Sequence, residues 1–505
     1  MFRRVLIANR GEIACRIATT LREMGIAPIA VCSAADRDAM HVRCADERVE
    51  LGPAEARDSY LNIPALLEAA RRTGAEAIHP GYGFLSENAG FASAVESAGL
   101  IFIGPSPESI RAMGDKRAAR DLAVEAGVPV VPGATGADVA ALCAAAKGMG
   151  FPVMVKAAMG GGGKGMRAVS EEGALVEALE SAQRLAASAF GDPSVYLEKR
   201  LEHARHIEVQ VLGDGQGEAI HFFERECSLQ RRHQKVIEET PSPAIDETRR
   251  ERLVFAAVAL AKRARYRGAG TVEFLVAPDG AFYFLEMNTR LQVEHPVTEL
   301  ATGHDLVRAQ VVVAATGKLP IPQPAVRRHG HAIEARVYAE DAAREFLPQA
   351  GRALRVRWPR APFVRVDAGV ESGDTVSVHY DPLLAKIIAY AETRERALGR
   401  LASALDDARV HGVVTNLPFL RALARSPAVA GAKFDTEWIE REFLADFEAV
   451  VRAPAPELAL AAAAIAEAAG RGAPTGVGAR TGAAAPRAAD AFESAGRWRQ
   501  RGLER

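Results

Sequence analysis

The sequence lacks the features that characterise membrane, secreted and nucleic-acid-binding proteins. No apolar run in its 505 residues reaches the roughly 20 residues that a membrane-spanning helix needs. Lysine and arginine (63) almost balance aspartate and glutamate (64), giving a net charge of −1, so the positive surface of a nucleic-acid-binding protein is not expected. Near the start, basic residues precede only a short apolar stretch, Val5–Ala8, which is too short for a signal peptide.

Cysteine is also scarce. The five cysteines are odd in number, lie far apart along the chain and lack the spacing of a zinc site or a disulfide framework. The sequence therefore predicts a protein of the reducing cytoplasm. The five are Cys15, Cys32, Cys44, Cys143 and Cys227.

Short apolar segments alternate with helical patterns over residues 1–112. Val5–Ala8 predicts a buried strand, and Glu12–Met24 has helical periodicity that ends at Gly25. This alternation predicts an α/β domain with a doubly wound parallel sheet. The glycine fingerprint of a dinucleotide site is missing after the first strand, so an NAD site is not expected there.

The rest of the chain divides into three segments. Residues 113–317 contain hairpin-forming stretches and predict an α+β domain with antiparallel sheets. Prolines between 320 and 324 indicate a linker, and residues 330–446 predict a mixed domain of strands and a helix. Residues 448–505 are rich in alanine, glycine and arginine and are expected to be largely disordered. A basic docking tail is the alternative for this last segment.

One predicted hairpin carries two acidic residues. Asp279–Gly280 is a two-residue turn signal between two stretches of strand-forming residues. Counted back from a pair between Pro278 and Ala281, the register places Glu273 opposite Glu286. Like charges directly opposed on a sheet are destabilising, and a divalent cation with oxygen ligands would offset the repulsion. The alternative is a pair of exposed glutamates without a ligand.

Polar residues then occupy every second position along the chain. In an extended strand this period of two places them all on one face. At about 3.3 Å per residue the two ends would lie roughly 26 Å apart, so a compact site requires a bend. The alternative is a row of groups that lines a long groove. The five residues are Glu286, Asn288, Arg290, Gln292 and Glu294.

A glycine-rich run follows a predicted strand that ends in Lys156. Consecutive glycines let the backbone approach a ligand closely, and the lysines add charges suited to phosphate. No Ser or Thr follows the Gly-Lys pair, so the run is not a Walker A loop. These features favour a nucleotide lid over a flexible turn, and Glu198 is a candidate partner for an adenine edge. The run comprises Gly160, Gly161, Gly162, Gly163, Lys164 and Gly165.

Basic and amide side chains are also concentrated within six positions further along. A solvated basic loop would account for them, but donors beside the predicted metal hairpin would also suit an anion such as phosphate or bicarbonate. They are Gln230, Arg231, Arg232, His233 and Lys235.

Five motifs together resemble the biotin carboxylase family, in the same order and over most of the chain, from about residue 1 to 446. They are Asn9–Ile13, His79–Asn88, Gly160–Gly165, Gln230–Lys235 and Glu286–His295. The resemblance implies the three-part biotin carboxylase fold with a central ATP-grasp domain. It also implies ATP-dependent carboxylation of N1′ of a carrier-bound biotin with bicarbonate, through carboxyphosphate, as the first half-reaction of an acyl-CoA carboxylase.

The resemblance further implies a role for each matching residue. Glu294 would deprotonate bicarbonate, and Arg336 would stabilise the enolate of biotin. Bicarbonate would be bound by Lys235, Arg290, Gln292 and Val293. Magnesium or manganese, with two ions expected, would be held by Glu273, Glu286 and Asn288. ATP would contact Lys116, Lys156, the Gly160–Gly165 run, Glu198, Lys199, Leu201, His206, Gln230 and His233.

Carrier domains of this family present a lysine in a Met-Lys-Met setting, and no Met-Lys pair occurs in this chain. A biotin carrier in trans and a carboxyltransferase subunit are therefore the expected partners, together with a homo-oligomeric state. The sequence leaves open whether the chain is a separate carboxylase subunit with an irregular extension or a long α chain cut short. The final carboxyl acceptor is open between an acyl-CoA and pyruvate. Two competing functions also stay open. One is a different ATP-grasp carboxylate ligase, against which Gln230–Lys235 and Arg336 argue, and the second is a non-catalytic nucleotide-binding scaffold.

Overall fold

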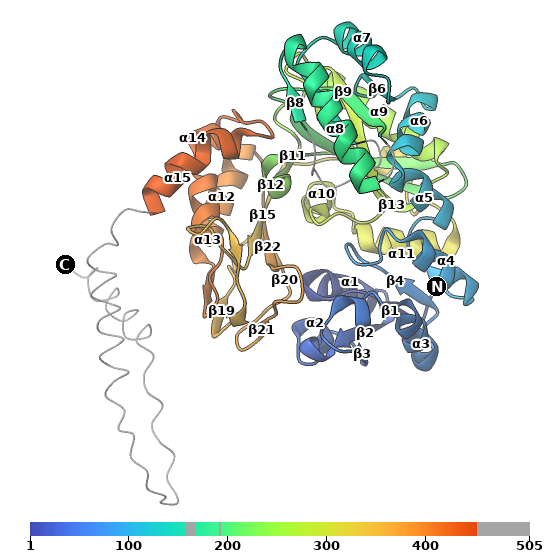
Figure 1. The fold of residues 1–505 in the computed structure, drawn as a ribbon. Coiled ribbons are helices and arrows are strands. Elements are labelled where there is room, and N and C mark those ends of the chain that lie inside the picture. Colours follow the sequence, from blue (N-terminus) through green and yellow to red (C-terminus); the bar gives the residue numbers. More distant parts are fainter. Residues whose placement is uncertain (158–166, 191–192, 452–505) are drawn as a thin grey trace, which may run out of the picture. The chain divides into compact units, whose positions relative to one another are not determined.

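The computed structural model describes residues 1–157, 167–190 and 193–451 of the chain (Figure 1). The predicted nucleotide loop, Gly160–Gly165, lies outside the described residues, and so does most of the predicted tail, 452–505. None of the described helices is long and apolar enough to cross a membrane.

Five parallel strands form the N-terminal sheet in the order β3-β2-β1-β4-β5. Successive side chains of β1 point to opposite faces. Val5 and Ile7 join one core with α1, whereas Leu6 joins another with α3 and α4. Helices therefore cover both faces, which confirms the predicted doubly wound sheet. The elements are β1 (Arg4–Ile7), α1 (Gly11–Glu23), β2 (Ala27–Ser33), η1 (Ala34–Asp36), α2 (Met40–Arg43), β3 (Glu47–Gly52), η2 (Ala56–Asp58), α3 (Ile63–Thr73), β4 (Ala77–His79), α4 (Ala89–Ser97), β5 (Ile101–Phe102) and α5 (Pro107–Gly114).

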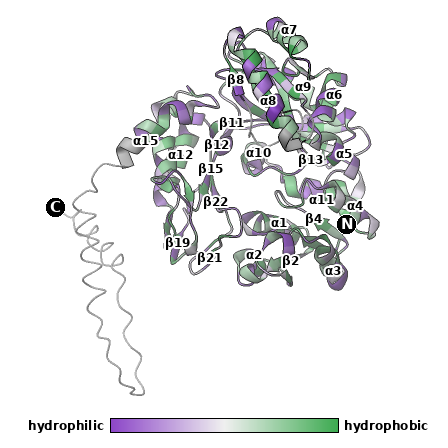
Figure 2. Cartoon of the chain, viewed as in Figure 1, coloured by the Kyte–Doolittle hydropathy of each residue, from purple (hydrophilic) through white to green (hydrophobic). Residues whose placement is uncertain are grey.

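A four-stranded antiparallel sheet in the order β6-β9-β7-β8 forms a separate layer of the central region. Helix α8 carries both hydrophobic and hydrophilic residues (Figure 2), and its apolar residues Leu175 and Leu179 are buried in a core with Val153 and Leu197 of the sheet. Burial of this one apolar stripe holds the helix on the sheet. The elements are α6 (Lys116–Glu125), β6 (Gly133–Gly136), α7 (Val139–Met149), β7 (Val153–Ala157), β8 (Arg167–Val169), η3 (Glu172–Ala174), α8 (Leu175–Phe190) and β9 (Val195–Lys199).

The largest sheet has eight antiparallel strands in the order β14-β13-β10-β11-β12-β15-β22-β20. It continues across the predicted linker, because β12 before the linker pairs with β15 after it. The elements up to the linker are β10 (Arg205–Asp214), β11 (Ala219–Arg231), β12 (Gln234–Thr240), α9 (Glu247–Arg263), β13 (Arg267–Val276), β14 (Phe282–Asn288), α10 (His295–Thr302), α11 (Leu306–Thr316) and η4 (Gln323–Ala325).

Beyond the linker, α12 packs on β22 and β15, and short two-stranded ladders surround them. Residues 1–444 form one compact unit, and a second unit begins at Ala445. The elements are β15 (His331–Tyr338), β16 (Glu340–Asp341), β17 (Leu347–Pro348), β18 (Gly351–Arg352), β19 (Arg355–Arg357), β20 (Val364–Ala368), β21 (Thr375–Val376), β22 (Leu383–Ala391), α12 (Arg394–Asp407), β23 (Arg409–His411), α13 (Leu417–Ala424), α14 (Pro427–Ala430), the π-helical η5 (Ile439–Phe443) and α15 (Leu444–Val451).

The β13–β14 hairpin confirms the predicted pair of Glu273 and Glu286 but not the predicted turn. The pair between Pro278 and Ala281 is wrong, because Ala277 N–H instead donates to Ala281 O at 2.8 Å. The turn therefore has three residues, and the register near it is one residue away from the predicted one. A bulge between Phe284 and Glu286 restores the register.

Candidate active site

A row of charged residues crosses one face of the eight-stranded sheet. Side chains of directly paired residues on neighbouring strands point to the same face. All of these residues except Glu286 are buried, and buried charges need partners close by. Along paired positions of β14, β13, β10 and β11, the row consists of Glu286, Glu273, Glu208 and Arg225.

Helix α10 lies against this part of the sheet. It packs on β11, β12, β15 and β22, and Arg225 Nη1 donates a hydrogen bond to Thr298 Oγ1 in the helix at 3.0 Å. Glu294 is the N-cap residue of α10 and is fully buried. The helix therefore brings a carboxylate at its N-terminus to the charged row.

The alternating polar segment bends, as a compact site requires. Strand β14 ends at Asn288, and the chain then turns before α10. Asn288 Nδ2 and Gln292 Nε2 both donate to Glu273 Oε1, at 2.8 and 3.0 Å. Two residues four positions apart thus meet at one oxygen, which excludes the extended row along a groove.

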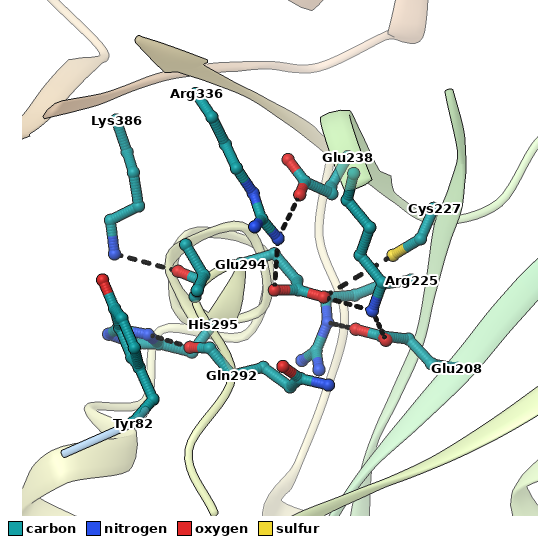
Figure 3. Close-up of polar contacts among 12 residues, drawn as sticks. Tyr82, Glu208, Arg225, Cys227, Glu238, Gln292, Glu294, His295, Arg336 and Lys386 are labelled. Carbon is teal, nitrogen blue, oxygen red and sulfur yellow. Dashed lines mark hydrogen bonds and ion pairs between the residues drawn. The ribbon is translucent and has the colours of Figure 1, made fainter. Parts of the chain in front are cut away.

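Glu294 is held between two cations, and Figure 3 shows its contact with one of them, Arg336. Its Oε1 lies 2.7 Å from Lys235 Nζ, and its Oε2 lies 2.8 Å from Arg336 Nη2. Burial raises the pKa of Glu294, but Lys235, Arg336 and Arg225 outweigh it and hold that pKa well below its ordinary value. The carboxylate is therefore ionised in this state of the protein.

Lys235 joins the charged row to α10. Its ammonium donates to Glu208, Glu273 and Glu294 at 2.6, 2.9 and 2.7 Å. Burial lowers the pKa of Lys235, but these three carboxylates outweigh it and raise the pKa well above its ordinary value. One lysine thus binds three buried carboxylates, and any change at Lys235 alters the surroundings of all three.

The predicted basic segment is a tight hairpin rather than a solvated loop. Gln230 on β11 pairs with Lys235 on β12, and Arg232 and His233 form the turn with φ angles of +48° and +64°. Gln230 is buried, whereas His233 is exposed. The hairpin thus separates Lys235, which reaches the charged row, from the residues at its tip.

Arg336 lies between two carboxylates. Its Nη2 is 2.8 Å from Glu294 Oε2 and 2.5 Å from Glu238 Oε1. Glu238 is fully buried and pairs directly with Glu334 across β12 and β15. Burial raises the pKa of Glu238 to about 7, although Arg336 opposes the shift. Burial also raises the pKa of Glu334 well above its ordinary value.

We expect Glu238→Gln to gain stability relative to the wild type as the pH rises from about 5 to 8. Because the folded-state pKa of Glu238 is raised from 4.5 to about 7, its protonated form favours folding below about pH 4.5, and this contribution is lost as the pH rises through 7. Glutamine does not titrate, so its contribution does not change with pH. The free energy of unfolding of the variant should therefore rise relative to that of the wild type by on the order of 2 kcal/mol between about pH 5 and 8. Urea unfolding across this range is the measurement. If the free energies of unfolding of the variant and the wild type changed with pH in parallel, Glu238 would be ionised in the folded protein over the whole of this range.

The predicted metal ligands lie on the β13–β14 hairpin. Glu286 faces Glu273. Partial desolvation by the surrounding protein and the Glu273 charge raise the pKa of Glu286, although the residue is exposed. Asn288 Oδ1 accepts a hydrogen bond from Arg290 at 3.0 Å. Two opposed carboxylates and an amide oxygen are a suitable donor set for a hard divalent cation, so these residues fit the predicted metal.

A second group of metal-type ligands lies beside them. Ligand atoms of His206, Glu208 and Glu273 lie within 4.8 Å of one another. His206 Nε2 is 2.9 Å from Glu273 Oε2, and the ammonium of Lys235 bridges the two glutamates. Because the lysine already supplies a positive charge there, the hairpin carrying Glu286 is the better candidate for a metal.

Arg290 is tied to the N-terminal domain. Its Nε donates to Glu87 Oε2 at 2.9 Å, and its Nη1 donates to Gln292 Oε1 at 2.7 Å. Glu87 also accepts a hydrogen bond from the backbone of Thr289 at 3.1 Å. The bend of the polar segment is therefore held by a residue about 200 positions earlier in the sequence.

The residues predicted to contact the nucleotide are more widely spread. Lys156 on β7 forms an ion pair with Glu198 on β9, so the structure brings these two together. Lys199 instead donates to the carbonyl oxygens of Gly150 and Phe151, which anchors it within the small sheet. Three others lie elsewhere: Lys116 is exposed at the start of α6, Leu201 is half-buried, and His206 is buried against Glu273.

Several residues of the site were not predicted from the sequence. Glu208 and Gln210 lie on the polar face of the alternating stretch from His206 to Leu212, so a period-two count could have found them. Glu238 and Lys386 had no comparable pattern. Arg225, fully buried, donates to Glu208, Gln210, Thr271 and Thr298, and only the paired strands reveal it.

Comparison with known proteins is consistent with this geometry. Residues 1–110 match the biotin carboxylase N-terminal domain, residues 115–321 match the carbamoyl-phosphate synthase L chain ATP-binding domain, and residues 334–441 match the biotin carboxylase C-terminal domain. Biotin carboxylase of Pseudomonas aeruginosa is 49% identical over 445 residues, which is 88% of this chain and 99% of that protein.

Two further relatives extend the comparison. The mitochondrial methylcrotonoyl-CoA carboxylase α subunit of Oryza sativa is 52% identical over 442 residues, which is 87% of this chain and 60% of that protein. The crystal structure of a biotin carboxylase–β,γ-ATP complex from Campylobacter jejuni superposes with a TM-score of 0.82 at 43% identity, covering 88% of this chain and 99% of that one.

The fold and the matched domains define an ATP-dependent ligase. Within this class, the chain belongs to the biotin carboxylase family. It spans about three-fifths of the length of the methylcrotonoyl-CoA carboxylase α subunits that it matches.

Proposed function

We propose that this protein uses ATP and bicarbonate to carboxylate N1′ of biotin on a carrier. The observation that carries the proposal is the carboxylate of Glu294 held between Lys235 and Arg336, at 2.7 and 2.8 Å. Family membership supports the reaction class, and the buried charges supply groups of the kind that it requires.

In the first step an oxygen of bicarbonate attacks the γ-phosphorus of ATP. The hydroxyl proton of bicarbonate passes to Glu294, ADP leaves, and carboxyphosphate forms. Lys235, Arg290, Gln292 and the backbone of Val293 orient bicarbonate, which converts a weak nucleophile into a positioned one. The C–O bond of carboxyphosphate then breaks to give CO₂ and phosphate, the phosphate takes the proton from N1′ of biotin, and N1′ forms the new bond to the carbon of CO₂.

Glu294 becomes a stronger base when substrates bind. Lys235 and Arg336 are two of the cations that hold its pKa low. A bicarbonate that draws Lys235 to itself, and a biotin oxygen that draws Arg336, both weaken this effect and raise the pKa of the carboxylate. Proton transfer is thereby coupled to the presence of both substrates.

Glu273, Glu286 and Asn288 would hold Mg²⁺ or Mn²⁺, and a bound divalent ion neutralises charge on the phosphates. Lys116, Lys156, the Gly160–Gly165 run, Glu198, Lys199, Leu201, His206, Gln230 and His233 are the proposed nucleotide contacts. The ion pair of Lys156 with Glu198 supports a common site for these two residues.

The partners and domain bounds are part of the same proposal. No Met-Lys pair occurs in these 505 residues, so the carrier domain lies outside them, and a carboxyltransferase subunit uses the carboxybiotin. The relatives favour an acyl-CoA acceptor, with methylcrotonoyl-CoA and propionyl-CoA as first candidates. Domains at 1–112, 113–317 and 330–446, a homo-oligomeric state and a cytoplasmic location complete the proposal.

A bicarbonate-dependence assay tests this function. We expect ADP formation to require bicarbonate and labelled bicarbonate to enter free biotin slowly, because an untethered substrate lacks the effective concentration of a docked carrier. A biotinylated carrier should raise the rate at the same total biotin. ADP formation that is indifferent to bicarbonate would favour a different ATP-grasp ligase, and no ADP formation would favour a binding scaffold.

We expect Glu286→Gln to raise the Mg²⁺ concentration needed for half-maximal ATP turnover by about tenfold or more, since loss of one charged ligand weakens a hard-cation site. ATP turnover titrated with Mg²⁺ is the measurement. Glu251→Gln, an exposed glutamate on α9, is the matched control and should leave the titration unchanged. An unchanged titration for Glu286→Gln would remove this residue from the metal site.

A further inference from the structure

Two cations stand directly opposite each other on neighbouring strands beside Glu294. Arg336 on β15 pairs with Lys386 on β22 in antiparallel register, so both side chains point to the same face. Figure 3 shows both reaching toward the segment that carries Glu294. Like charges so placed repel each other, and each therefore requires partners of its own.

These partners include two consecutive residues of the polar segment. Arg336 binds the carboxylate of Glu294 at 2.8 Å, and Lys386 Nζ donates to the carbonyl oxygen of Val293 at 2.9 Å. That carbonyl shares one planar peptide unit with the backbone nitrogen of Glu294. A group that fixes the carbonyl therefore restricts the backbone at Glu294 and the direction of its side chain.

Lys386 is charged although it is fully buried. Burial lowers its pKa, but Glu12, Glu334 and Asp367 outweigh this effect and raise the pKa above its ordinary value. Its Nζ lies 3.1 Å from Glu12 Oε1 and 3.7 Å from Asp367 Oδ2. A buried ion pair is commonly replaced by apolar residues without loss of stability, so stability alone does not account for an ammonium here.

The ammonium is itself held from the N-terminal domain. Glu12 on α1 also accepts a hydrogen bond from the Tyr82 hydroxyl. The loop around Tyr82 is fixed in turn, because Asn9 Nδ2 donates to the carbonyl oxygens of Pro80 and Tyr82, both at 2.7 Å. The N-terminal domain therefore fixes the position of the Lys386 ammonium, and the ammonium in turn fixes the peptide unit before Glu294.

We propose that Lys386 is a positioning residue for Glu294: its ammonium donates a hydrogen bond to the Val293 carbonyl oxygen and so orients the carboxylate that accepts the bicarbonate proton. This inference rests on the proposed function of Glu294. It assigns Lys386 no contact with substrate and no role in proton transfer.

The test compares Glu12→Gln with the double variant Glu12→Gln/Lys386→Met. Both variants carry Glu12→Gln because removing Lys386 alone would leave the buried carboxylate of Glu12 without its cation. Asp367 needs no substitution, since it keeps both bonds to Arg365, each 2.7 Å long. Methionine retains the length of the side chain but cannot donate to the carbonyl. Any difference between the two variants therefore reports on the ammonium.

We expect the double variant to show a kcat for bicarbonate-dependent ADP formation roughly 10²-fold below that of Glu12→Gln, the effect of a misplacement of about 1 Å. The KM for ATP should be equal in the two variants. The acidic limb of the pH–rate profile should not move, because Lys235, Arg336 and Arg225 set the pKa of Glu294. Equal kcat values in the two variants, or an acidic limb that lies at a different pH in the double variant, would show that Lys386 does not position Glu294.

A second measurement does not depend on activity. Hydrogen exchange of a peptide covering residues 289–296 should accelerate in the double variant, while a peptide covering residues 13–20 of α1 should exchange equally in both. Unchanged exchange at 289–296 would overturn the proposed grip on the backbone. If the wild type formed no ADP in response to bicarbonate, the proposed function would fail, and the exchange result would still decide whether Lys386 orders this segment.

Discussion

Glu294→Gln is expected to lower bicarbonate-dependent ADP formation by about 10²- to 10⁴-fold, which is what a positioned general base contributes. Glutamine preserves the size of the side chain, and its oxygen still accepts a hydrogen bond from Lys235 or Arg336, but it takes up no proton at neutral pH. The KM for ATP should change little, because Glu294 contacts the two cations and not the predicted nucleotide residues. Initial rates with and without bicarbonate provide the measurement.

The matched control is Glu299→Gln on the same helix. Glu299 is also buried and also bound by two arginines, Arg16 and Arg365, at 2.8 and 2.7 Å. It contacts neither Lys235 nor Arg336, so its loss should reduce stability rather than kcat. Equal losses of kcat in both variants would mean that the effect of Glu294 is structural, and the base would then have to be sought elsewhere.

Arg336→Ala is expected to lower biotin carboxylation by about 10²- to 10³-fold, the typical effect of removing one donor that stabilises charge in the transition state. The KM for ATP should remain near that of the wild type. Carboxylation of free biotin, measured from labelled bicarbonate, is the readout. Arg336→Lys retains the positive charge but not the two-pronged donor, so it should recover only part of the rate.

Arg336→Ala needs a control for the loss of buried ion pairs. Arg336 binds both Glu294 and Glu238, so alanine leaves two buried carboxylates with one partner fewer. Arg250→Ala is the control, because Arg250 is equally buried and binds Glu224 at 2.8 Å, away from the site. If the KM for ATP rises sharply for Arg336→Ala alone, the residue belongs to the nucleotide site.

Much of the local structure was predictable. The turn signal at Asp279–Gly280, between two strand-forming stretches, predicted a hairpin with Glu273 and Glu286 opposed, and the ladder confirms that pair. The turn was wrong by one residue, because Pro278 joined the loop and a bulge at Leu285 compensated. Propensity identifies the two strands, but a bulge depends on packing that no local pattern records.

The site could be predicted only in part. Its residues were suggested by motifs, yet the choice between a bend and a long groove stayed open until Asn288 and Gln292 were seen to meet at Glu273. The contacts of Lys235 with three glutamates on three different segments depend on strand order. Strand order is a property of long-range pairing, which a single sequence does not specify.

The sequence by itself determined the parallel α/β domain, the absence of a Walker A loop and of a dinucleotide fingerprint, and the likeness to the biotin carboxylase family. These follow from local patterns, since periodicity and turn residues act within a few positions. Only the tertiary structure decided that Arg336 and Lys386 face each other and bind two consecutive residues, Glu294 and Val293. Both cations lie on strands more than 40 residues beyond Glu294 in the sequence, and buried charges select their partners by proximity in space, because burial makes an unpaired charge too costly to retain.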